Sequence, residues 1–238
     1  MSEIRFYRNW CEDKDLVSFN VVVKESDLYI RAQNNLAGKA YKLVSKYRLI
    51  LEKYIGRNPA FENSLEPISL GEDAPVIARE MAKTGRKAGV GPMAAVAGAI
   101  AEFVGKDLLD YTPEVIVENG GDIFVKTTRI RRIGIYAGNS PFTKKIAIEI
   151  SPEKTPLGVC TSSGTVGHSL SLGKADAVVV LSPSTILADA SATAIGNLIK
   201  DESDISSGIE FAKKIKGVKG VLIIKDDKMG IWGDIKIS

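Results

Sequence analysis

The sequence has little cysteine and histidine, and it lacks any long hydrophobic run. Its two cysteines, Cys11 and Cys160, do not make a disulfide framework, and together with one histidine they cannot readily build a structural zinc site. No window approaches the roughly 20 apolar residues of a membrane span. The first residues carry no apolar signal segment. We therefore expect a protein of the reducing cytoplasm without a membrane partner.

The chain also lacks an excess of charge of one sign. Its formal net charge of +3 is too small to argue for nucleic acid as a partner. A hydrophobic content of 45% and a charged content of 26% are ordinary for a soluble globular protein. Because 238 residues are enough to bury a real core, we expect a single domain over residues 1–238.

Strand patterns and helix patterns occur in separate blocks, which predicts an α+β fold. A polar turn at 24–27 separates two strand patterns, so a hairpin is expected near the start. Apolar residues three and four positions apart indicate helices between the strands. The predicted elements are strands at 4–10, 17–23 and 28–32, helices at 36–55, 75–87 and 93–104, strands at 115–118, 122–127, 132–136, 145–150, 158–161 and 177–181, a helix at 206–216, and a hairpin of 218–224 with 231–237.

A short echo in the sequence suggests two related halves, about 1–128 and 129–238. An Ala-rich helix pattern precedes strands ending in Gly121-Asp122-Ile123, and a second one precedes strands ending in Gly233-Asp234-Ile235. Two related antiparallel sheets with Ala- and Gly-rich helices packed on them would explain this echo. A match this short also arises by chance, so both explanations stay open.

The run Ala188-Asp189-Ala190-Ser191-Ala192-Thr193-Ala194 is the strongest candidate for a site. We expect Asp189 in the first turn of a helix, where its carboxylate faces unpaired N–H groups. Thr193 lies four residues on and therefore on the same face. A carboxylate and a hydroxyl aimed at one point suit a hard cation such as Mg²⁺. The alternative is that Asp189 caps the helix and Thr193 packs in the core.

The segment Gly89-Val90-Gly91-Pro92-Met93-Ala94 fits a loose dinucleotide-binding pattern. We reject that interpretation because no strand precedes it. Pro92 instead predicts the start of a small-residue helix, whose N-terminus behind Arg86 and Lys87 can receive a phosphate. A tightly packed core helix after a Gly-rich loop is an equal alternative. One functional hypothesis, an unrelated acid- or phosphate-binding enzyme, would use Arg86, Lys87 and Gly91.

Four motifs follow one another in the second half of the chain. They are Glu118-Asn119-Gly120-Gly121-Asp122-Ile123, Cys160-Thr161-Ser162-Ser163-Gly164, His168-Ser169-Leu170-Ser171-Leu172-Gly173 and the Ala188–Ala194 run. Their order resembles that of the ApbE family, the FAD:protein FMN transferases, and looks most like a reduced branch of it without an assigned activity. The resemblance covers Val115 to Ile199.

The resemblance implies FAD or FMN and Mg²⁺ as cofactors, and a protein Ser or Thr as the acceptor of FMN. It makes Asp189 and Thr193 metal ligands and His168 the catalytic residue, whose neutral imidazole takes a proton from the attacking hydroxyl. A homodimer is expected at the level of the family only. The candidate nucleotide-binding residues are Gly91 at the helix start and, by resemblance, Asn119, Gly120, Gly121, Asp122, Thr161, Ser162, Ser163 and Gly164.

Two departures from the family pattern leave a second function open. Residues 90–98 stand in the place of the family's Asp-Leu-Gly-x-x-Ala-Lys-Gly motif, so its acidic and Lys groups have no counterpart. Ser171-Leu172 replaces the Asp-Pro that follows the family's histidine. Because affinity follows ligand charge, a metal site that loses a carboxylate binds more weakly. The alternative is therefore a non-catalytic protein that binds a nucleotide or flavin, which leaves open whether the chain is an enzyme.

Overall fold

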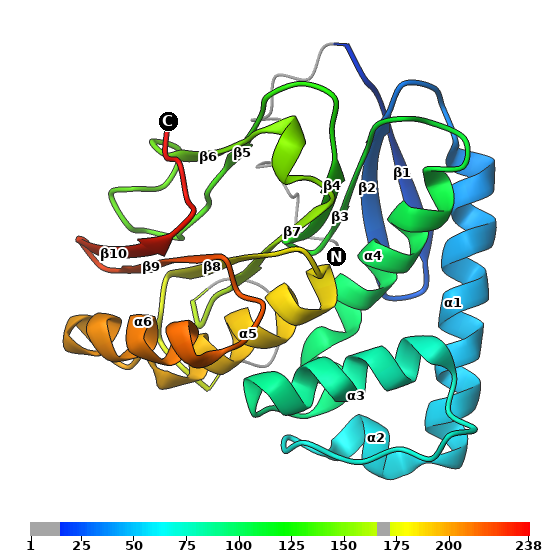
Figure 1. Cartoon of the computed structure of the whole chain (residues 1–238), viewed down its shortest axis with the longest axis horizontal. Helices are drawn as coiled ribbons and strands as arrows, with labels where there is room; N and C mark the ends of the chain where they lie inside the picture. The colour runs from blue at the N-terminus through cyan, green and yellow to red at the C-terminus, as the bar shows by residue number, and fades with distance from the viewer. Residues whose placement is uncertain (1–14, 166–171) are drawn as a thin grey trace.

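The computed structural model describes residues 15–165 and 172–238, and it has the predicted α+β architecture (Figure 1). Its main element is one open sheet of eight strands, in which every neighbouring pair is antiparallel. The strands in spatial order are β1 (Val17–Val23), β2 (Ser26–Ala32), β3 (Val115–Asn119), β4 (Asp122–Lys126), β7 (Leu157–Ser162), β8 (Ala177–Ser182), β9 (Gly220–Lys225) and β10 (Lys228–Gly233).

Helices cover one face of this sheet, and a two-stranded sheet of β5 (Arg131–Gly134) and β6 (Ala147–Ile150) covers part of the other (Figure 1). Apolar side chains alternate along the strands, so each face contributes to its own core. The helices are α1 (Ala37–Arg57), α2 (Pro59–Asn63), α3 (Val76–Ala88), α4 (Val96–Leu108), α5 (Thr185–Leu198) and α6 (Ile205–Lys214), and the short 3₁₀ turns are η2 (Pro92–Ala95), η3 (Pro152–Lys154) and η4 (Glu202–Asp204).

Two local predictions differ from the structure. Helix α2 lies between the predicted helices 36–55 and 75–87, where no element was predicted, with Pro59 in its first turn and Phe61 buried. The turn of the last hairpin is shorter than the predicted strands 218–224 and 231–237 imply. Only two residues join Lys225 to its partner Lys228, and Asp226 adopts a φ of 53° there. The predicted strand at 4–10 lies outside the described residues.

The chain forms two blocks, each a hairpin, a group of helices and a second hairpin: β1 to β4 with α1–α4, and β7 to β10 with α5 and α6. The pairing of β4 with β7 joins the two blocks into one sheet. Gly121 lies in the β3–β4 turn, whereas Gly233 ends β10, so the two Gly-Asp pairs occupy different places. The division into related halves therefore stays a prediction.

Within the described residues, no single helix is long and apolar enough to span a membrane. The bent pair Val76–Ala88 and Pro92–Leu108 passes that test of length and composition only when the two are taken together. Most of α4 is buried in the main core, as expected for a core helix of its composition.

Candidate functional site

The β3–β4 hairpin brings two candidate residues to one face of the sheet. Asn119 and Asp122 are cross-strand partners, so only two residues form the loop between them. These are Gly120 and Gly121, with φ of +70° and +108°, in the left-handed region that favours glycine. The two glycines therefore form the turn between the predicted strands 115–118 and 122–127, and its geometry places the side chains of Asn119 and Asp122 side by side.

Strand pairing then places Cys160 beside this turn. Cys160 is the partner of Asp122 in the β4–β7 register, so both side chains lie on the helical face. The buried thiol donates a hydrogen bond to the carbonyl of Thr185 at 3.4 Å. Burial, with the nearby charges of Asp122 and Asp189, raises the pKa of the Cys160 thiol well above its usual range. Because the thiolate is the reactive form, this environment disfavours Cys160 as a nucleophile.

Asp189 lies in the second turn of α5, so its expected place in the first turn is wrong. The helix begins at Thr185 because the Ser184 hydroxyl accepts the Leu187 N–H at 3.3 Å and caps it. Four helical residues therefore precede Asp189. Its carboxylate is too far along α5 to face the free N–H groups of its own helix.

The Asp189 carboxylate instead caps a different helix. Its Oδ2 accepts a hydrogen bond of 2.8 Å from the N–H of Gly98, the third residue of α4. A side chain at Gly98 has no room, because its Cβ would lie 2.7 Å from the Thr185 carbonyl and 2.8 Å from the Asp189 Cβ. On the other side of this turn, Asn119 Nδ2 donates to the Ala97 carbonyl at 3.1 Å. The start of α4 is thus the point where the β3–β4 turn and α5 meet.

Two buried carboxyls meet at this point, and no cation among the described residues compensates them when they ionise. Asp122 and Asp189 are each 8% exposed, and neither forms an ion pair with any described residue. Burial, assisted by the Glu118 carboxylate, raises the pKa of Asp122 to about 7. Burial and the charge of Asp122 raise the pKa of Asp189 well above its usual range, although the N–H groups of Gly98 and Ala97 oppose this. The site therefore favours a proton or a cation.

Two threonines lie one turn from Asp189 on α5. The predicted ligand Thr193, one turn after it, is half-buried. Thr185, one turn before it, has a fully buried hydroxyl that forms no hydrogen bond in the described chain. Ser162 lies near Gly196, where an added Cβ would be 3.2 Å from its Oγ. The side chain of Thr161 points to the opposite face of the sheet, because its partner Val179 belongs to the core between the main sheet and β5–β6. Only the backbone of Thr161 therefore reaches Asp122.

Three further candidates are held by local packing. The Gly164 N–H donates to the Ala175 carbonyl at 2.9 Å, and the Ser163 hydroxyl lies 3.3 Å from that of Thr165. The Gly91 N–H donates to the Leu65 carbonyl at 2.8 Å, and the Ser64 carbonyl fills the space of a side chain at Gly91. The N-terminus of α4 therefore lies beyond Gly91, at 96–98, where Asp189 caps it.

His168 lies outside the described residues. Of the two basic residues considered for a phosphate, Arg86 donates hydrogen bonds to the Ile68 carbonyl and the Ser69 hydroxyl. Sequence reasoning missed Glu102, whose Oε2 accepts hydrogen bonds from the Ser184 hydroxyl and the Ile186 N–H, both 3.1 Å long. The signal for it was present, because Glu102 is the only charged residue in the predicted helix 93–104.

Comparisons with known proteins cover almost the whole chain. The model of a family described as AbpE bacteria matches residues 8–227. The chain is 43% identical to a UPF0280 protein of Methanocaldococcus jannaschii over 221 residues, 90% of both proteins. It is 41% identical to a UPF0280 protein of Methanopyrus kandleri over 225 residues, 92% of this chain and 91% of that protein.

Two solved structures have a similar fold. The apo form of the flavinyl transferase ApbE from Pseudomonas stutzeri matches with a TM-score of 0.61 at 15% identity, over 92% of this chain and 94% of that one. The flavin transferase ApbE from Vibrio cholerae matches with a TM-score of 0.53 at 14% identity, over 94% of this chain and 97% of that one. At such identities the likeness concerns the fold alone.

Proposed function

Since the chain belongs to the AbpE bacteria family, in its branch of UPF0280 proteins, we propose that it binds a flavin nucleotide with Mg²⁺ and transfers FMN from FAD to a protein Ser or Thr. The observation that carries this proposal is the pair of buried carboxyls, Asp122 and Asp189, without a compensating cation at the start of α4. The flavin transferases of similar fold support the choice of flavin. The proposal includes a cytoplasmic location and the homodimer expected above.

The donor set suits Mg²⁺ rather than a transition metal. No three His, Cys, Asp or Glu side chains form a metal-binding group in the described part of the chain. Mg²⁺ is commonly held by one or two carboxylates with waters and substrate phosphates, so Asp189 and Thr193 would suffice with oxygens from the nucleotide. When bound, the ion would neutralise charge on the phosphates. Asp122 would add negative charge nearby, and Asn119 would hold the turn against α4.

A second function, flavin binding without transfer, is favoured by one observation. The segment that stands in place of the family's acidic and Lys motif is small and largely buried, and Gly98 leaves no space for a side chain. The Ala97 carbonyl is already used by Asn119. In this case the pocket would bind flavin, but no charged group from 90–98 would assist the reaction.

Calorimetry with FAD and with FMN, each in Mg²⁺ and in chelator, tests the binding that both functions share. We expect binding that requires Mg²⁺ in the wild type and is lost in Asp189→Asn. A Glu210→Gln variant is the matched control, because Glu210 is an exposed residue of α6 paired with Lys213. Absence of any flavin binding by the wild type would contradict both functions. Covalent FMN on acceptor serines or threonines, measured by mass spectrometry, separates transfer from binding.

A further inference from the structure

Helices α4 and α5 cap each other through two buried carboxylates. Asp189 of α5 accepts the N–H of Gly98 in the first turn of α4 at 2.8 Å. In return, Glu102 of α4 accepts the N–H of Ile186 in the first turn of α5 at 3.1 Å. The Ser184 hydroxyl donates to the same Glu102 oxygen at 3.1 Å. Each helix therefore satisfies free N–H groups at the start of the other.

Glu102 is placed for this role by its surroundings. It is 5% exposed, so its position is fixed by the packing of α4 on α5. Its second oxygen, Oε1, accepts a hydrogen bond from Lys106 at 2.6 Å, one turn later on α4. The two oxygens thus have separate partners, one in each helix. The carboxylate cannot rotate without losing a bond to one of them.

Two contacts tie the starts of the two helices to each other. Helix α5 also packs on β7, β8 and α3, which hold its general position. The contact of Glu102 with Ile186, about one turn from that of Asp189 with Gly98 on each helix, ties the first turn of α5 to α4 as well. The crossing is close, because the Thr185 carbonyl approaches Gly98 where a side chain would stand. A small movement of α5 would therefore displace the Asp189 carboxyl directly.

We propose that Glu102 is a positioning residue for the cation site, because it holds the first turn of α5 and thereby the Asp189 carboxyl. This inference rests on the proposed function, in which Asp189 and Thr193 bind Mg²⁺. Glu102 acts here through Asp189 and not as a ligand, because both of its oxygens are already bonded within the protein. Its loss displaces Asp189 and Thr193 together, since both lie beyond the clamped turn on one rigid helix.

Binding of Mn²⁺, used as a paramagnetic substitute for Mg²⁺, tests this role in the full chain. The variant Glu102→Gln keeps the side-chain size but removes the charge, and Glu210→Gln is its exposed control. Substitution of a residue that supports metal ligands typically changes metal affinity about 10- to 100-fold. We therefore expect the Kd for Mn²⁺ to rise at least tenfold in Glu102→Gln and to stay unchanged in the control. The electron paramagnetic resonance spectrum of bound Mn²⁺ should also change, because the ligand geometry changes. Circular dichroism selects conditions in which each variant is folded.

The outcomes separate the inference from the function beneath it. Equal Kd and identical Mn²⁺ spectra for wild type and Glu102→Gln, with only a lower unfolding midpoint, would show a purely structural cap and overturn the inference. A wild type that binds no Mn²⁺, either alone or with FAD present, would remove the proposed function as well. Should Glu102→Gln not fold, Glu102→Asp retains the charge and shortens the reach. It is expected to bind Mn²⁺ more weakly than wild type, and unchanged binding would again overturn the inference.

Discussion

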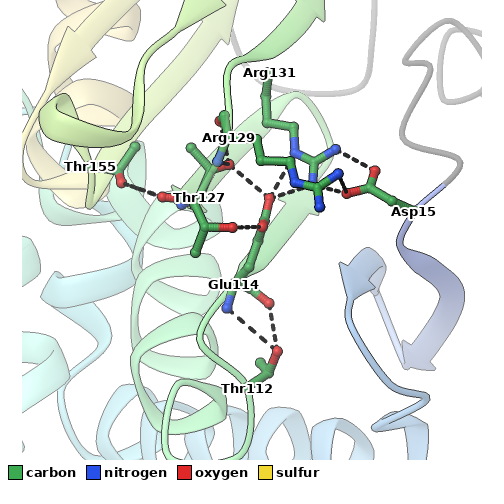
Figure 2. Close-up of polar contacts among 8 residues, drawn as sticks. Asp15, Thr112, Glu114, Thr127, Arg129, Arg131 and Thr155 are labelled. Atoms are coloured by element: carbon green, nitrogen blue, oxygen red, sulfur yellow. Dashed lines mark hydrogen bonds and ion pairs between the residues drawn. The ribbon is translucent and has the colours of Figure 1, made fainter.

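Two pairs of carboxyls in this protein, Glu114 with Asp15 and Asp122 with Asp189, have opposite surroundings. At the start of β3, Glu114 receives hydrogen bonds from the hydroxyls of Thr127 and Thr128 at 2.7 and 2.6 Å, and from Arg131 Nε at 2.7 Å (Figure 2). Arg131 also binds both oxygens of Asp15, at 2.7 and 2.9 Å. At the start of α4, by contrast, two buried carboxyls lie near each other and no described cation pairs with them.

The pKa values reflect this difference. Burial alone would raise the pKa of Glu114, but the two threonine hydroxyls and Arg131 bring it below its ordinary value. Arg131 likewise lowers the pKa of Asp15 to about 2. Burial raises the pKa of Asp122 to about 7 instead. We call the first group, Glu114 and Asp15, complete, because Arg131 and hydroxyl groups of the protein satisfy its carboxyls, and we regard it as structural. We call the second group, Asp122 and Asp189, incomplete, because no described cation pairs with it, and this makes it a candidate for ligand binding.

Breaking the complete group should have the largest effect on stability. Replacing Arg131 by Met leaves Glu114 buried without its cation, and loss of one partner of a buried ion pair costs about 3–5 kcal/mol. Urea unfolding measures this loss. The matched change in the incomplete group, Asp122→Asn, removes a charge that has no partner and should cost far less at pH 8. Equal losses in the two variants would contradict the contrast between the groups.

Adding Mg²⁺ should stabilise the protein through the incomplete group alone. A ligand at 100 times its Kd raises the free energy of unfolding by about 2.7 kcal/mol when it binds only the folded state. We expect such a gain for the wild type and for Thr128→Val, and none for Asp189→Asn. Thermal unfolding with and without Mg²⁺ is the measurement. A gain retained in Asp189→Asn would place the cation elsewhere.

Filling the space at Gly98 should damage the site more than the fold. The added methyl group of Gly98→Ala meets the Thr185 carbonyl and the Asp189 Cβ, and overpacking of this kind costs about 1–3 kcal/mol. Because α5 must move away, Mg²⁺ binding should fall as well. Gly38→Ala is a suitable control, since nothing lies within 4 Å of a Cβ there. Urea unfolding and Mg²⁺ calorimetry on both variants compare the two positions.

The two groups should also respond to pH in opposite directions. Asp122 has a folded pKa of about 7, above the ordinary 3.8, so the folded state binds the proton more tightly. In chelator, its contribution to stability is therefore present at low pH and is lost as pH rises towards 7, by up to about 1.4 kcal/mol per pH unit. Asp15, with its pKa lowered to about 2, loses its contribution as pH falls below 3.8.

Unfolding free energies of wild type and Asp122→Asn between pH 4 and 8 check this sign. The variant should show a smaller decline from pH 4 to 7 than the wild type, because Asp189, whose pKa burial also raises, still titrates in it. A wild-type curve that rises over that range, with no difference from the variant, would mean that Asp122 is not held in its protonated form.

Local patterns in the sequence were enough to predict several parts of this structure. The Gly120-Gly121 turn follows from residues that tolerate positive φ, and the alternation of apolar residues predicted the antiparallel strands. The order of motifs pointed to the right family. Each of these signals lies within a few residues, where local chemistry decides the outcome.

The features that sequence reasoning missed depend on contacts between distant segments. Asp189 caps α4 rather than its own helix, and that could be known only once the crossing of α4 and α5 was known. The same crossing gives Glu102 its partners. Thr161 was grouped with Ser162, but strand alternation turns their side chains to opposite faces. A sequence motif reports residues that are close along the chain, whereas the geometry of a site depends on residues that are close in the folded structure.

The hydrogen bond between Gly98 and Asp189 joins residues 91 positions apart. It also crosses the boundary between the two predicted halves, as does the pairing of Asp122 with Cys160. Separate fragments, 1–128 and 129–238, would each carry half of the carboxyl pair and neither would bind the ion alone. Recovery of Mn²⁺ affinity on mixing them would report directly on reassembly of the molecule.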